Sequence, residues 1–172
     1  ADFTAPVACA GPPQLLTCVV TQIVLGGSCS SIGANFTYLW SGPGINAGNS
    51  SSLTPNINIP GSYTLLVINT ANGCTSTDNV IVTQDIIEPQ TASAGPDLSL
   101  PCGGGTVTLA GSHTGGPNFT FVWTTVGGNF LSGAMTLNPI VNEPGTYMLM
   151  VVNTISGCTS TDVMQVTNNP SG

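Results

Sequence analysis

The 172-residue chain contains neither lysine nor arginine; it has one histidine and seven acidic residues, giving a formal net charge of −7. Without cationic side chains the surface has no footprint for phosphate, which argues against nucleic-acid binding. It also lacks a cationic face that would attract an anionic membrane. No apolar run approaches the ~18 residues needed to cross a bilayer, so we expect no membrane insertion. The fold must rest on packing, hydrogen bonds and disulfides.

A tandem repeat organises the sequence. Residues 73–78, Gly-Cys-Thr-Ser-Thr-Asp, recur as residues 157–162, at an offset of 157 − 73 = 84. One residue drops out upstream, so that Trp40 matches Trp123 at an offset of 123 − 40 = 83. We therefore expect two small domains, residues 1–85 and residues 86–172, with residues 86–92 as a connector. Because residues 8–12 align with residues 92–96, the sequence is also expected to begin where a linker from a preceding copy would lie.

Each copy reads as a series of short strands without helical periodicity. In the first copy we expect strands at residues 15–19, 21–25, 36–40, 53–59, 62–69 and 75–83. In the second we expect them at residues 98–102, 106–109, 119–125, 135–141, 146–153 and 159–167. Residues 62–69 form the strongest strand, β-branched or aromatic throughout, as expected for a central strand buried on both faces. An Asn72-Gly73 step predicts a tight hairpin after it. The fold class is all-β, two immunoglobulin-like β-sandwiches in tandem.

These motifs resemble a known family. Ala-Gly-Pro, an aromatic-x-Trp strand, Pro-Gly-x-Tyr and Gly-Cys-Thr-Ser-Thr-Asp, each present in both copies, are similar to the tandem PKD-like and immunoglobulin-like repeats of large secreted bacterial surface proteins. That family includes adhesins and fibres exported through the type IX system. The resemblance covers nearly the whole chain and implies an extracellular module used mainly as stalk or spacer.

The repeat suggests how the six cysteines pair. Cys18 and Cys74 have counterparts in Cys102 and Cys158, so each copy is predicted to close its own disulfide. The remaining two cysteines, Cys9 and Cys29, are replaced in the second copy by Ser93 and His113, which predicts that they pair with each other. The alternative is that one or both are free thiols or link neighbouring chains. Persistent disulfides require an oxidising compartment, which fits secretion.

No catalytic constellation emerges, and we expect no enzyme activity. His113 is expected in a loop, without the nucleophile and orienting acid that a triad needs. No cofactor is predicted, although calcium at the domain junction is an open alternative because oxygen ligands suit it. The ligands would come from the acidic residues Asp78, Asp85, Glu88, Asp97 and Asp162; for the repeated pair Asp78 and Asp162, the simpler interpretation is a solvated strand residue or a side-chain bond to backbone.

A repeated aromatic stripe bears on the function. It comprises Phe36, Tyr38 and Trp40 in the first copy and Phe119, Phe121 and Trp123 in the second. We expect it to form core, whereas exposed rings would make a platform for sugars. The predicted function is a rigid, protease-resistant stalk or filament unit of an extracellular bacterial surface fibre or adhesin. Its partners would be other copies of the repeat, neighbouring subunits or a surface glycan. The alternative is a carbohydrate-binding module of a secreted polysaccharide-degrading enzyme.

Overall fold

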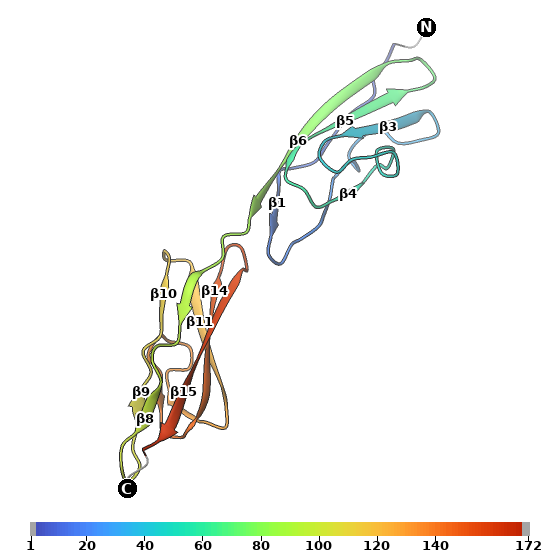
Figure 1. Ribbon diagram of the computed structural model, residues 1–172. Helices are drawn as coiled ribbons and strands as arrows, with labels where there is room; N and C mark the ends of the chain where they lie inside the picture. The colour runs from blue at the N-terminus through green and yellow to red at the C-terminus, as the bar shows by residue number, and fades with distance from the viewer. Residues whose placement is uncertain (1–2, 170–172) are drawn as a thin grey trace. The chain divides into compact units, whose positions relative to one another are not determined.

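The computed structural model describes residues 3–169 and divides into two compact units, Ala1–Ile86 and Ile87–Gly172 (Figure 1). The division falls one residue after the expected boundary at residue 85. The described residues contain strands, turns and bends and no helix. Both units are all-β, in agreement with the predicted fold class.

The first unit pairs a four-stranded sheet with a two-stranded sheet. The larger sheet has the order β1-β6-β5-β3, and the smaller joins β2 to β4. The strands of this unit are β1 (Gln14–Thr17), β2 (Ile23–Val24), β3 (Phe36–Ser41), β4 (Asn56–Ile57), β5 (Gly61–Asn69) and β6 (Thr75–Asp85).

The second unit repeats this arrangement with additional short strands. Its four-stranded sheet has the order β11-β14-β15-β8, beside a three-stranded sheet β12-β13-β9 and a two-stranded sheet β10-β7. The strands of this unit are β7 (Gln90–Ser93), β8 (Leu98–Leu100), β9 (Val107–Thr108), β10 (Ser112–Thr114), β11 (Phe119–Val126), β12 (Phe130–Ser132), β13 (Ile140–Val141), β14 (Gly145–Asn153) and β15 (Thr159–Asn168).

Some local expectations differ from the structure. The segment expected as a connector, residues 86–92, includes most of β7, which pairs with β10. The strand expected at residues 135–141 shrinks to β13, and turn and bend residues precede it. Between β5 and β6 the chain makes a wider turn than a two-residue hairpin: Gly73 adopts a φ of +77° and its N–H donates to the Asn69 carbonyl at 2.7 Å.

The central strand β5 is buried on one face rather than two. Tyr63, Leu65 and Val67 are fully buried, while the residues between them are partly exposed. An antiparallel sheet of a sandwich packs only its inner face, so the alternation is that of a half-buried strand. Apolar residues on the outer face had suggested a second covering layer that the unit does not have.

The repeated Ala-Gly-Pro motif has a steric cause. Gly11 and Gly95 both adopt a φ of +86°, a region that residues with a Cβ rarely occupy. A Cβ at Gly95 would lie 2.8 Å from the Ala110 carbonyl oxygen, and one at Gly11 would lie 3.1 Å from that of Gly26. Glycine is therefore required where the incoming segment turns against the smaller sheets.

A buried tyrosine fixes one corner of each unit. The Tyr63 hydroxyl lies 2.5 Å from the Ile59 carbonyl oxygen and 2.8 Å from that of Pro43. In the second unit the Tyr147 hydroxyl donates to the Glu143 carbonyl at 2.7 Å. A tyrosine bonded to backbone four residues upstream is the tyrosine corner of immunoglobulin-like sandwiches.

Burial of Tyr63 predicts a loss of stability in alkali. Desolvation raises the pKa of Tyr63 above its ordinary value of 10.0. In the unfolded chain the phenol ionises near pH ~10, so its contribution is complete below that pH and is lost as the pH rises toward the folded-state pKa. We expect Tyr63→Phe to flatten the fall in urea midpoint of the first unit between pH ~9 and ~11. An unchanged slope in the variant would assign the fall to other groups.

Candidate functional site

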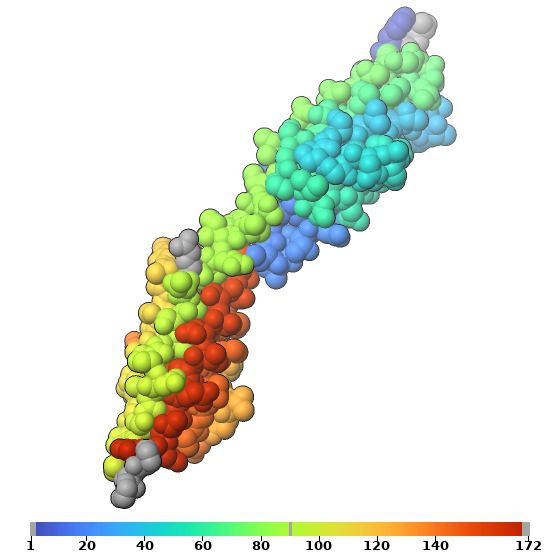
Figure 2. Space-filling view, viewed as in Figure 1, coloured from blue at the N-terminus to red at the C-terminus, as the bar shows by residue number. Residues whose placement is uncertain are grey.

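The described part of the chain offers no ligand pocket, and the faces seen in Figure 2 carry no evident deep hollow. Among residues 3–169, no group of three or more His, Cys, Asp or Glu side chains is placed to hold a metal ion. No helix in this range is long and apolar enough to cross a membrane. The residues that recur in both copies are therefore the remaining candidates for a functional site.

His113 lies in strand β10 and not in a loop. Its ring centroid is 5.1 Å from that of Phe119 and 4.9 Å from that of Phe121. Its Nδ1 is buried and has no hydrogen-bond partner among the described residues. The flanking glycines had suggested a loop, but the short ladder with β7 makes the segment a strand. His113 therefore packs against two aromatic rings of β11.

The repeated aspartates tie the incoming segment to the large sheet. Asp78 accepts a hydrogen bond from the Ala10 N–H at 2.8 Å, and Asp162 accepts one from the Ala94 N–H at 2.8 Å. Both bonds span 68 residues, so the two copies make the same contact. Each aspartate is thus a side-chain-to-backbone clamp, which was the simpler of the two interpretations.

Removing the second clamp is expected to weaken its unit. Asp162→Ala leaves the Ala94 N–H without its charged acceptor, which should lower the free energy of unfolding by roughly 1–3 kcal/mol. Asp162→Asn keeps an acceptor oxygen and should lose less. Urea unfolding of both variants checks this, and equal stability of Asp162→Ala and the parent chain would contradict a clamping role.

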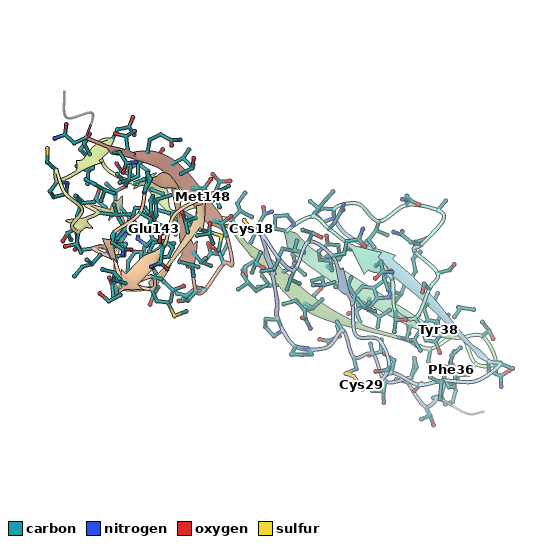
Figure 3. All side chains as sticks on the ribbon, turned by 90° about the horizontal axis from the view of Figure 1, so that it is seen from below. Cys18, Cys29, Phe36, Tyr38, Glu143 and Met148 are labelled. Carbon is teal, nitrogen blue, oxygen red and sulfur yellow. A yellow bond between two sulfur atoms is a disulfide. The ribbon has the colours of Figure 1, made fainter. Side chains whose placement is uncertain are left out.

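The aromatic stripe contributes to the core. Trp40 and Trp123 are only 1% and 3% exposed. In the first unit, Phe36 and Tyr38 of β3 are partly buried against the core cluster that contains Trp40. The two side chains lie close together in Figure 3. Neither tryptophan offers a face for a sugar ring to stack upon.

The predicted disulfide between Cys9 and Cys29 is present, with their Cα atoms 5.5 Å apart. In the second unit the equivalent segments are joined by the β7–β10 ladder, in which Ser93 pairs with Ser112. The same two segments of the first unit share a bond from the Ser31 N–H to the Val7 carbonyl at 3.0 Å. The disulfide therefore stands where the other copy has a strand pair.

Each unit has an N-terminal pole, where the chain enters it. In the first unit this pole carries the β5–β6 turn, because Asn72 Nδ2 donates to the Thr4 carbonyl at 3.1 Å. In the second unit it carries the β14–β15 turn, because Ser156 Oγ donates to the Ile87 carbonyl at 3.1 Å. Cys74 and Cys158 lie in these turns.

The C-terminal pole is where the chain leaves each unit. Strand β1 pairs in parallel with the last part of β6, so that Thr17 stands opposite Asp85. Strand β8 pairs in parallel with the last part of β15, and Leu100 stands opposite Asn168. Cys18 and Cys102 follow these first strands, so both lie at a C-terminal pole.

The predicted long disulfides, Cys18 with Cys74 and Cys102 with Cys158, are therefore wrong. In each unit the two cysteines lie at opposite poles, separated by nearly the full length of β6 or β15, about 30 Å at ~3.3 Å per residue. A disulfide needs Cα atoms within ~7 Å. Neither pair can close within its own unit.

The four pole cysteines differ in oxidation state. Cys18 and Cys158 are each disulfide-bonded, whereas Cys74 and Cys102 are free thiols. Cys102 is exposed and accepts a hydrogen bond from Asn169 Nδ2 at 3.3 Å, and Cys74 is half-buried. Sequence reasoning missed these thiols. The Asn72-Gly73 step placed Cys74 in the turn after a long strand, but nothing local revealed that Cys18 lies at the other end of the unit.

Comparison with known proteins gives a fold and no family. No protein-family model matches the chain, and no curated protein sequence matches it. Among solved structures, the N-terminal eight Ig domains of the Down Syndrome Cell Adhesion Molecule match with 15% identity and a TM-score of 0.53. The match covers 96% of this chain and 24% of that one.

Two further structures resemble the chain less closely. Drosophila OTK extracellular domains 3–5 match with 15% identity and a TM-score of 0.45, over 96% of this chain and 60% of that one. A SusE-like surface-located polysaccharide-binding protein of Bacteroides thetaiotaomicron matches with 11% identity and a TM-score of 0.44, over 96% and 34%. At such identities the likeness to the cell adhesion molecule shows the fold alone, tandem Ig-like domains.

Proposed function

We propose that this chain is a structural repeat segment of an extracellular bacterial surface fibre, filament or adhesin. Its Ig-like units act as rigid building blocks of a stalk or filament. The bacterial and type IX assignment rests on the sequence motifs that resemble PKD-like repeats. The structural role rests on the units themselves.

One observation carries the proposal: the residues that recur in both copies serve the fold. The aspartate clamp and the tyrosine corner bond to backbone, and Trp40 and Trp123 fill the two cores. Recognition of a ligand would require groups that face outward, with a pocket or an aromatic platform. A module whose repeated residues form internal hydrogen bonds and pack in the cores is suited to a mechanical role.

Two further features suit an extracellular setting. The Cys9–Cys29 disulfide persists only in an oxidising compartment. The absence of lysine and arginine removes every cleavage site for proteases of trypsin specificity. We expect the native chain to survive prolonged trypsin treatment intact.

Deleting these two repeats from the parent gene tests the proposal. Electron micrographs of the producing cells should show surface fibres shortened by two unit lengths, with attachment at the fibre tip preserved. The purified two-unit chain should bind nothing on a glycan array. Fibres of unchanged length, together with loss of binding to one glycan class, would favour the carbohydrate-binding alternative.

A further inference from the structure

The oxidation state of the pole cysteines is reversed between the two units. In the first unit the cysteine at the C-terminal pole, Cys18, is oxidised and the one at the N-terminal pole, Cys74, is free. In the second unit Cys158 at the N-terminal pole is oxidised and Cys102 at the C-terminal pole is free. A cysteine at either kind of pole can therefore form a disulfide.

We propose that Cys74 and Cys102 join this chain covalently to further copies of the repeat. Each disulfide would link the C-terminal pole of one copy to the N-terminal pole of another. For two molecules of this chain, the bond is between Cys102 of one and Cys74 of the other. This inference rests on the proposed structural function and identifies the covalent bond, called the joint below, that would connect successive copies.

The two free thiols favour a bond between unlike poles, because one lies at an N-terminal pole and the other at a C-terminal pole. A single kind of bond between unlike poles uses both thiols of every molecule, whereas bonds between like poles would require two kinds. A bond between unlike poles is head-to-tail, so it leaves one reactive pole at each end and can be repeated from molecule to molecule. A joint between like poles would instead be two-fold symmetric.

Both thiols are placed to react. Cys102 lies in the turn after β8 and is exposed, and its sulfur accepts a hydrogen bond from Asn169 Nδ2. Cys74 is half-buried in the β5–β6 turn, where its N–H donates to Asn72 Oδ1 at 2.9 Å. That bond fixes the backbone, and the sulfur has no disulfide partner among residues 3–169.

The chemistry balances with a small-molecule disulfide as the oxidant. The thiolate of one cysteine attacks oxidised glutathione, breaks its S–S bond and releases one glutathione thiolate. The thiolate of the second cysteine then attacks the protein sulfur of this mixed disulfide and releases the second glutathione. Two protein thiols lose two electrons and two protons, and one glutathione disulfide becomes two thiols.

A mixing experiment tests the joint. The purified chain, incubated at high concentration with oxidised glutathione, should form a ladder of oligomers on non-reducing gels that collapses to monomer with reductant. Cys74→Ser alone and Cys102→Ser alone should each stay monomeric. An equimolar mixture of the two variants should give dimers and nothing larger, since each offers one reactive pole.

The double variant Cys74→Ser/Cys102→Ser is the matched control and should remain monomeric with an unchanged unfolding midpoint. Chymotryptic mapping of the dimer should yield a peptide pair linked through Cys74 and Cys102. Dimers in either single variant alone would overturn the pairing of unlike poles. A parent chain that stays monomeric would overturn the proposed disulfide between copies. If the chain stays monomeric but its deletion still shortens the fibre, the stalk function holds without the disulfide, so failure of the disulfide and failure of the stalk function are distinguishable.

Discussion

Replacing Trp123 with alanine is expected to lower the free energy of unfolding of the second unit by about 3–5 kcal/mol. The side chain is 3% exposed, packs in the core cluster of this unit, and donates from Nε1 to the Thr136 carbonyl at 2.9 Å. Truncation leaves a large cavity and removes that bond. Calorimetry or hydrogen exchange resolved by unit measures the effect, because the variant lacks the tryptophan whose fluorescence would report unfolding of the second unit.

The two copies provide a matched control for the hydrogen-bond contribution. Trp40 is equally buried, but its Nε1 has no hydrogen-bond partner among the described residues. Trp123→Phe should therefore cost its unit about 1 kcal/mol more than Trp40→Phe costs the first. A loss below ~1 kcal/mol in Trp123→Ala would place this ring on the surface and revive the sugar-platform interpretation.

Removing the Cys9–Cys29 disulfide is expected to destabilise the first unit by about 3 kcal/mol, the value for closing a loop of this length. The sequence separation is 20 residues. The variant Cys9→Ser/Cys29→Ser resembles the second copy, where Ser93 stands in place of Cys9. The described part of the first unit, however, has no counterpart of the β7–β10 ladder that joins these segments in the second unit. Urea unfolding should show the transition of the first unit shifted and that of the second unmoved.

Cys74→Ser is the control for that experiment, because it removes a cysteine of the same unit that forms no disulfide. Its urea midpoint should match that of the parent chain. If the double variant at Cys9 and Cys29 also matched the parent chain, the disulfide would be redundant with the backbone bonds between the two segments, such as the one from the Ser31 N–H to the Val7 carbonyl.

Local patterning was sufficient to predict the long strands. The aromatic and β-branched runs became β3, β5, β11 and β14, and the segments after the two turns became β6 and β15. The short strands β7, β10 and β12 were missed, because segments of three or four residues are too short to show an alternation of apolar and polar positions. Their strand character comes from partners far along the chain, as when Ser93 pairs with Ser112.

The disulfide connectivity shows where sequence reasoning ends. The repeat correctly grouped the cysteines into equivalent positions and predicted the Cys9–Cys29 bond. It could not reveal that β1 runs parallel to the end of β6, which places Cys18 and Cys74 at opposite poles. Parallel pairing of strands some 68 residues apart is set by the assembled sheet, and no local signal encodes it.

The central claim is that the cysteines repeated in both copies lie at opposite poles of each unit and do not pair with each other inside it. Alkylation of the native chain without reductant, followed by intact mass and chymotryptic mapping, tests it most directly. The account predicts two alkyl groups, on Cys74 and Cys102, and a linked peptide pair containing Cys9 and Cys29. Linked peptides joining Cys18 to Cys74, or Cys102 to Cys158, would contradict it.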